Sequence, residues 1–284
     1  MPVRTHADLI QQMNSLPVSP GCLAIWGLGQ MGAALKGSDG RLVYIDPVLT
    51  NVVAEKIPAA ADKFVRAFPA PLNPSEITNA SLVLCTHEHL DHTDPLTLGP
   101  LVKASPQAKI ITTGWCKELL DEAEIESERR IVPPAEQSLD FEGIHITAIP
   151  VGHYQVEFDS MHGYRYFSYL IEWNGIVFYH SGDFVIDPGY LQRMRAYPKA
   201  DIALVAANGR DAYREANDCV GNLMPSEVVW LAQELDWDLI IPGHNDLFAW
   251  NTISTGLLPD AIQRNHPRQR FHILQPGELF YYIR

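Results

Sequence analysis

The sequence has few cysteines, no long apolar run and little positive charge. Its four cysteines, Cys22, Cys85, Cys116 and Cys219, form no Cys-x-x-Cys pair. We therefore expect buried thiols in a reducing compartment. The longest uninterrupted apolar run is Ile202 to Ala207, far short of the ~20 residues that span a bilayer. The first twenty residues lack the apolar segment of a secretory signal, and we predict a cytoplasmic protein.

The charge balance is acidic. There are 21 Lys and Arg residues against 34 Asp and Glu, which gives a formal net charge of −13. This deficit argues against sequence-independent binding of nucleic acid, which depends on neutralising phosphates. We expect neither nucleic acid nor a membrane as a partner, and leave a homo-oligomer open. A chain of 284 residues can bury a large core without disulfides or structural metals.

Apolar runs bounded by turn residues predict many short strands, with helices mainly outside them. The turn Gly37-Ser-Asp-Gly40 and the dipeptide Asn174-Gly175 indicate hairpins. Two strand-rich halves with interspersed helices favour a single α/β domain over residues 1–284, built from two packed sheets. The predicted strands are Cys22–Trp26, Met31–Lys36, Leu42–Asp46, Ser81–Cys85, Lys109–Thr113, Ser138–Phe141, Ile144–Val151, Tyr166–Trp173, Ile176–Ser181, Asp201–Ala206, Asp238–Pro242, Arg270–Leu274 and Glu278–Ile283, and the predicted helices are Asp94–Lys103, Trp115–Glu126, Pro225–Leu235 and Leu258–Asn265.

One histidine-rich motif carries the chemistry. His87, His89, Asp91 and His92 follow directly after the buried strand Ser81–Cys85. In an extended loop, residues two apart point the same way, so His87 and His89 can converge on one ion. If a helix begins near Asp91, Asp91 and His92 turn to a neighbouring position. Four ligating groups in six residues suit two ions about 3.5–4 Å apart.

Three further candidate ligands stand at predicted strand ends. His153 follows Ile144–Val151, Asp183 follows Ile176–Ser181 in His-Ser-Gly-Asp, and His244 follows Asp238–Pro242 in Pro-Gly-His-Asn-Asp. Each lies where a strand gives way to a glycine-bearing loop, a usual place for a site on a rigid scaffold.

These seven residues, in this order and context, resemble the metallo-β-lactamase superfamily. The resemblance implies a four-layer αββα sandwich with a metal site at one edge. It implies that His87, His89 and His153 hold one ion, that Asp91, His92 and His244 hold a second, and that Asp183 bridges both. Within the superfamily the chain is similar to the L-ascorbate-6-phosphate lactonase-like branch, through the phrases LGQ at 28–30, IDP at 45–47, FYHSGD at 178–183, DIAL at 201–204 and IIPGHNDLFAWN at 240–251.

We therefore predict a metal-dependent hydrolase, and within that class a lactonase. Its predicted partner is a small anionic substrate, a phosphorylated, sugar-type lactone similar to L-ascorbate-6-phosphate. The nitrogen and oxygen ligands fit Zn²⁺ or Mn²⁺, and Fe²⁺ also fits. A hydroxide held between two ions would attack the carbonyl, with Asp91 and His244 as catalytic candidates and Asp91 orienting the nucleophile or moving its proton. Arg210, Arg214 and Asn222 are candidates for substrate binding, because a guanidinium binds phosphate or carboxylate bidentately.

Other interpretations of the sequence remain. The same metal site could cleave a small phosphodiester, and a non-enzymatic scaffold could keep the metal for structure alone. Gly27, Gly29 and Gly32 match the dinucleotide-binding pattern, with Asp46 at the place of the ribose acid. Only nine residues separate Gly32 from Leu42, too few for a helical crossover, so a hairpin is favoured there. His180 is expected to pack in the core rather than to bind metal.

Overall fold

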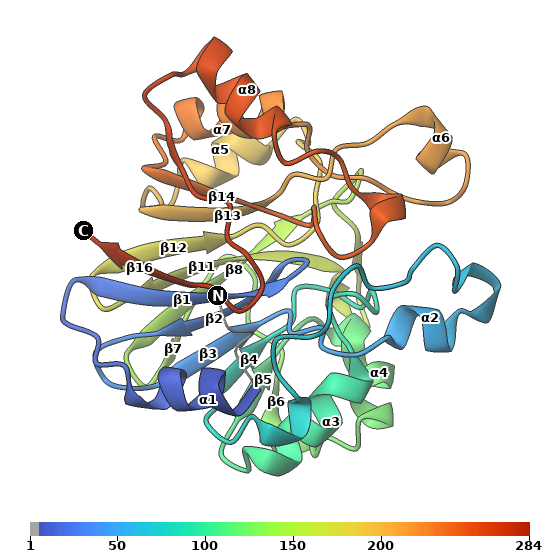
Figure 1. Ribbon diagram of the computed structural model, residues 1–284, viewed down its shortest axis with the longest axis vertical. Helices are drawn as coiled ribbons and strands as arrows, with labels where there is room; N and C mark the ends of the chain where they lie inside the picture. Colours follow the sequence, from blue (N-terminus) through green and yellow to red (C-terminus); the bar gives the residue numbers. More distant parts are fainter. Residues whose placement is uncertain (1–5) are drawn as a thin grey trace.

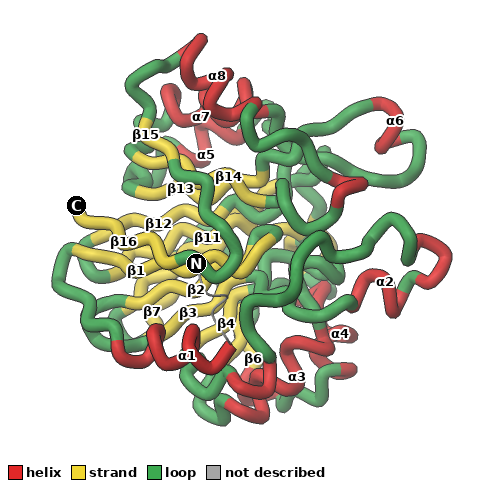
Figure 2. The backbone as a smooth tube through the Cα atoms, viewed as in Figure 1, coloured by secondary structure: helices red, strands yellow, loops and turns green. Residues whose placement is uncertain are grey.

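The computed structural model describes residues 6–284, and residues 1–5, the start of the polar N-terminal stretch, lie outside the description. Two seven-stranded sheets pack against each other, with helices on their outer faces (Figures 1 and 2). This is the predicted α/β, four-layer αββα architecture. In spatial order, the first sheet contains β16 (Leu279–Ile283), β1 (Cys22–Gly29), β2 (Gly32–Lys36), β3 (Leu42–Ile45), β4 (Leu82–Leu84), β5 (Lys109–Ile111) and β6 (Arg130–Ile131).

The second sheet has the same number of strands in a different arrangement. In spatial order the strands are β15 (Arg270–Phe271), β14 (Leu239–Gly243), β13 (Ile202–Ala206), β12 (Ile176–His180), β11 (Tyr166–Trp173), β8 (Ile144–Val151) and β7 (Ser138–Phe141), while β9 (Phe158–Asp159) and β10 (Gly163–Tyr164) form a separate hairpin. Strands β8, β12, β13 and β14 all run in one direction, because β11 is antiparallel to both β8 and β12, and β13 and β14 are parallel to β12. Their carboxyl ends therefore meet at one edge.

Most of the helices cover the two outer faces of the sandwich. The α-helices of the described residues are α1 (His6–Ser15), α2 (Val52–Lys56), α3 (Pro95–Ala104), α4 (Lys117–Glu122), α5 (Tyr190–Met194), α6 (Ala212–Glu215), α7 (Pro225–Glu234) and α8 (Leu257–Asn265). On the first sheet lie α1 and α3, with α4 beside α3, and on the second lie α5, α7 and α8 (Figure 1). The two short helices α2 and α6 belong to loops that project at one end of the sandwich (Figure 1).

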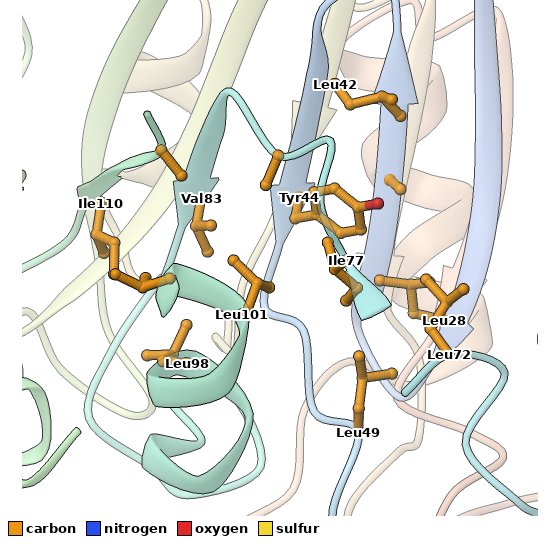
Figure 3. Packing of buried hydrophobic residues seen from close by; sticks show 14 of the residues in the cluster. Leu28, Leu42, Tyr44, Leu49, Leu72, Ile77, Val83, Leu98, Leu101 and Ile110 are labelled. Atoms are coloured by element: carbon orange, nitrogen blue, oxygen red, sulfur yellow. The ribbon is translucent and has the colours of Figure 1, made fainter. Parts of the chain in front are cut away.

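Three apolar clusters correspond to the interfaces between these layers. The central cluster joins the facing sides of both sheets and includes Ile25 and Ile146. The outer clusters join each sheet to its helices. Figure 3 shows Leu98 and Leu101 of α3 beside Val83 of β4. Burial on both faces explains why most of the predicted strands are continuous apolar runs rather than alternating ones.

Two local details bear on the sequence-based predictions. The first decides between two alternatives, and the second corrects the length of a helix. The glycine-rich segment after β1 is an antiparallel hairpin to β2, with a register irregularity between Gly27 and Gly29. The dinucleotide-binding alternative, which needs a helical crossover, is therefore wrong. The predicted helix Trp115–Glu126 is shorter: a 3₁₀ turn at Gly114–Cys116 leads into α4, which ends at Glu122, and Glu124 adopts a left-handed backbone with φ 55°. No helix within residues 6–284 has the length and hydropathy needed to cross a bilayer.

Candidate metal centre

The loop between β4 and α3 is fixed at both ends by its own polar side chains. Asp94 caps α3 by accepting from the backbone N–H groups of Leu96 and Thr97, as expected of an acidic N-cap. Thr93 Oγ1 donates to the carbonyl of His87 at 2.5 Å. The backbone N–H groups of His92 and Thr93 both donate to the carbonyl of His89. The motif thus forms a tight turn that directs its side chains to one side.

The structure brings all seven candidate ligands together. They form two groups, within each of which one ligand atom per residue lies within 4.8 Å of the others: His87, His89, His153 and Asp183 in one, and Asp91, His92 and His244 in the other. Asp183 contacts both groups. Its Oδ2 lies 3.4 Å from His153 Nε2 and 3.1 Å from His244 Nε2, and its Oδ1 lies 3.3 Å from His92 Nε2.

The parallel course of the strands explains this convergence. His153 follows β8, Asp183 follows β12 and His244 follows β14, so the three arrive at the same edge of the second sheet. The loop after β4 meets them from the first sheet. His244 has a left-handed backbone, with φ 61°, which a non-glycine residue adopts only when its surroundings hold it there.

The site fits a divalent metal ion. His87 Nε2, His92 Nε2 and Asp183 Oδ1 are buried and have no hydrogen-bond partner. Buried polar atoms of native proteins are nearly always paired, so three such atoms facing one cluster indicate a missing partner. The donors are nitrogen and oxygen only, which suits zinc, manganese or iron.

Neighbouring polar groups orient two of the histidines. Asp46, fully buried after β3, lies with its Oδ2 2.7 Å from His92 Nδ1 and accepts from both the N–H and the hydroxyl of Thr86. Thr86 Oγ1 in turn lies 3.0 Å from His87 Nδ1. A carboxylate on the far ring nitrogen fixes the tautomer and the orientation of a ligating histidine, so Asp46 presents His92 Nε2 to the centre.

Gln30, in the turn between β1 and β2, contacts the second group. Its Nε2 donates to Asp91 Oδ2 at 2.6 Å and lies 3.1 Å from His244 Nε2. Sequence reasoning did not single out Gln30 as a site residue, and it treated Asp46 only as part of the dinucleotide pattern. Gln30 stands in the phrase LGQ and Asp46 in the phrase IDP, both of which carried the family resemblance. That resemblance was the sequence signal that could have marked them as site residues.

The charges of the cluster are those a cation site requires. Burial lowers the pKa of His87 well below its usual value, and burial together with His153 lowers the pKa of His89 to about 4. Burial alone would lower the pKa of His244, but Asp183 and Asp91 raise it to about 9. Burial would raise the pKa of Asp183, yet His244 and His92 hold it well below its usual value. At neutral pH the carboxylates are ionised, and the proton on His244 is one that a bound cation would displace.

The other histidines near the site have different partners. His180 is buried and pairs through Nε2 with the carbonyl of Met31 at 2.8 Å, while the N–H of Gly182 donates to its Nδ1. This confirms that His180 packs in the core. His162 contacts Asp159 at 3.0 Å and is absent from both ligand groups among the described residues.

The three predicted substrate-binding residues form contacts with protein groups. Arg210 binds both carboxylate oxygens of Glu227, at 2.7 and 2.6 Å. Arg214 is 4% exposed and donates to Asp211, to the carbonyl of Asn208 and to Asn251. Asn222 is fully buried and donates to Asn208 Oδ1 at 3.0 Å. In these positions the three side chains brace the loop that carries α6, and their role in substrate binding stays a prediction.

A cavity of about 340 Å³ opens at the metal centre. Its lining includes five of the candidate ligands, namely His89, Asp91, His153, Asp183 and His244. The rest of its wall comes from the segment around α2, from the loop after β4, from residues 218–220 and from Asn251. A second cavity of about 470 Å³ adjoins it and shares His89, His153 and Val220. Reactants therefore have direct access to the clustered side chains.

Comparison with known proteins identifies the family. A model of the β-lactamase superfamily domain matches residues 41–245, which contain every candidate ligand. This chain belongs to the metallo-β-lactamase superfamily. By its family and its cluster of histidine and aspartate donors, it is a metal-dependent hydrolase. A relative from Salmonella paratyphi B, described as "Probable L-ascorbate-6-phosphate lactonase UlaG", is 24% identical over 271 residues, which cover 85% of this chain and 74% of the relative.

Three solved structures are similar to this chain in fold. Igni18, a metallo hydrolase from Ignicoccus hospitalis, has a TM-score of 0.65 at 16% identity, with 92% of this chain and 98% of that chain covered. An isothiocyanate hydrolase from Delia radicum gut bacteria has a TM-score of 0.68 at 16% identity, with 90% and 98% covered. CmlA, a diiron β-hydroxylase from Streptomyces venezuelae, has a TM-score of 0.60 at 11% identity, with 94% and 55% covered.

Proposed function

We propose that this superfamily member is a lactonase, which opens a lactone ring by hydrolysis at a centre of two divalent ions. The observation that carries the proposal is the pair of ligand groups that share Asp183 at the floor of one cavity. The Salmonella relatives, described as probable lactonases, support the choice of lactones among possible substrates.

The chemistry requires one water per turnover. The carbonyl carbon gains a hydroxyl oxygen, the ring C–O bond breaks, and the leaving oxygen takes up a proton. When bound, two such ions supply a hydroxide near neutral pH and polarise the carbonyl under attack. His87, His89 and His153 would hold the first ion, Asp91, His92 and His244 the second, and Asp183 both.

The residues of the chain supply positioning and proton handling. Asp91 is the candidate for moving the proton, because its side chain is 18% exposed at the cavity, whereas that of Asp183 is 4% exposed. Burial would raise the pKa of Asp91, but His92 and His244 lower it, so its carboxylate is ionised at neutral pH. Gln30 orients the same carboxylate through Oδ2.

The test is turnover of a lactone panel by protein loaded with Mn²⁺ or Zn²⁺. The panel contains a phosphorylated sugar lactone, unsubstituted γ-butyrolactone and γ-lactones with alkyl chains, and bis(p-nitrophenyl) phosphate serves as a phosphodiester. We expect at least one lactone to be opened with a catalytic efficiency within the usual enzyme range of roughly 10⁴–10⁸ M⁻¹s⁻¹. Cleavage of the phosphodiester with every lactone left intact would instead identify a phosphodiesterase at the same site.

A further inference from the structure

Part of the lining of the cavity at the metal centre is an apolar wall. We define this apolar wall as Val53, Ile57, Phe64 and Leu90, all of which line the cavity. Val53 belongs to α2 and Ile57 follows its last residue. Ile57 is 44% exposed, an exposure that leaves a large apolar side chain facing solvent at the rim of the cavity.

The apolar wall is supported from behind. Phe64 packs on Phe248 at 5.3 Å between ring centroids, in an edge-to-face arrangement. Val53 and Phe248 belong to one buried cluster, against which Phe64 and Leu90 pack. Lys63 reaches across to the face of Trp250 at 4.6 Å, so its charge is directed to the loop after β14. The wall is therefore a fixed surface built from two chain segments rather than a single exposed side chain.

Positive side chains are scarce around this cavity. Within residues 6–284, its lining contains no Lys or Arg, whereas Glu88 and Asp218 add two carboxylates to the two among the metal ligands. Glu88 Oε2 is buried there without a hydrogen-bond partner. A carboxylate oxygen in this position accepts a hydrogen bond from a substrate hydroxyl or amide and repels an anion.

Arg165, in the adjoining cavity, does not change this shortage of positive side chains. Arg165 lines the second cavity and donates to Glu88 at 2.5 Å and to Glu157 at 3.0 Å. It lies at 5.1 Å over the rings of both Trp115 and Tyr166. One fixed cation between two carboxylates therefore adds no surplus of positively charged side chains, and such side chains form the strong, charge-assisted hydrogen bonds to phosphate.

We propose that the substrate carries an uncharged, apolar substituent, which packs on the apolar wall while its ester or lactone carbonyl faces the metal centre. The proposal rests on the proposed function and narrows it to alkyl-substituted lactones in place of phosphorylated sugar lactones. The cavity volume of about 340 Å³ suits a small ligand, at the lower end of the usual range of roughly 300–1,000 Å³.

The test compares γ-lactones whose side chains grow from none to six carbons with a phosphorylated sugar lactone, using the metal-loaded protein. We expect kcat/KM to rise by up to about fourfold for each methylene until the wall is covered, the equivalent of ~0.8 kcal/mol per CH₂. The phosphorylated lactone should be the poorest substrate of the panel. Equal kcat/KM along the series, or a preference for the phosphorylated lactone, would overturn the inference, whereas the proposed lactonase activity would still stand. Failure of every lactone would instead refute the proposed function.

A variant at the rim tests the wall directly. Ile57→Lys places a cation on the apolar wall at a side chain that is already partly exposed, so the fold should tolerate it. We expect kcat/KM for the longest alkyl lactone to fall about tenfold, with a much smaller fall for γ-butyrolactone. The matched control is Ile283→Lys, an exposed residue of β16 at the opposite end of the sandwich from α2 (Figure 1). If Ile57→Lys kept the wild-type rise of kcat/KM with alkyl length, the apolar wall would not be the binding surface of the substituent.

Discussion

Gln30 and His244 hold each other in place from opposite sheets. The N–H of His244 donates to the carbonyl of Gln30 at 2.8 Å, and the amide nitrogen of Gln30 lies 3.1 Å from His244 Nε2. Both residues have left-handed backbones, with φ 58° and 61°. The N–H of Gln30 also donates to Asp246 at 2.8 Å. The β1–β2 turn therefore fixes the loop that supplies a candidate ligand after β14.

Removing the side chain of Gln30 should weaken the second metal position selectively. Gln30→Gly keeps the positive φ without strain but deletes the amide that orients Asp91. Groups that orient a ligand typically contribute 10–100-fold in metal affinity, and we expect a loss of that size for one of two ions. Competition with a chromophoric chelator measures both affinities.

Two further variants control this experiment. Asparagine also adopts the left-handed backbone, and Gln30→Asn shortens the side chain by one methylene. This variant should therefore lose most of the same metal affinity. Gln263→Ala, at an exposed position of α8, should change neither affinity. Unchanged affinities in Gln30→Gly would exclude a positioning role for this residue.

Asp183→Ala should reduce metal content and abolish turnover together. Asp183 contacts histidines of both ligand groups through its two oxygens, and its loss leaves His92 and His153 without a shared anionic partner. Elemental analysis of protein purified without chelator gives the metal content, and Asp260→Ala on exposed α8 is the control. Full metal content with full activity would contradict the two-ion arrangement.

Removal of metal should destabilise the whole protein, because bound ions stabilise only the folded chain. A metal present at ~1,000 times its Kd contributes about 4 kcal/mol. For a chain of this size, each kcal/mol corresponds to about 2–4 °C in Tm. We therefore expect EDTA to lower Tm by about 8–16 °C and Mn²⁺ or Zn²⁺ to restore it, as measured by scanning calorimetry. A Tm that is indifferent to EDTA would indicate that no metal is held tightly.

The two loop arginines should differ in their effect on stability. Arg214 is buried among Asp211, Asn208 and Asn251, and Arg214→Ala should cost about 2–4 kcal/mol because it leaves buried acceptors without donors. Arg210 pairs with Glu227 at partial exposure, and Arg210→Ala should cost about 1 kcal/mol or less. Urea unfolding measures both values. An increase in KM for a phosphorylated lactone with unchanged stability would instead assign the arginines to substrate binding.

Much of the fold could be predicted because local signals agreed with the tertiary arrangement. The run at 82–84 is apolar on both faces and could only be an interior strand, and Asp94 marks the start of α3. Some elements were missed where the local signal is weak. Helix α1 is polar except for a few apolar residues such as buried Leu9 and Met13, and Lys36 of β2 binds the carbonyls at its end, a contact that sequence proximity does not reveal.

The donor set and its place in the chain follow from the amino-acid sequence, because metal ligation requires particular side chains and apolar runs mark where strands end. The polar groups that surround those donors follow from the packing of the fold. Gln30 meets Asp91 across 61 residues and His244 across 214, and Asp46 meets His92 across 46. The same packing pairs Arg210 with the carboxylate of Glu227 and Arg214 with the side chain of Asn251. Such contacts depend on how two sheets and their loops are packed, and no spacing along the chain encodes them.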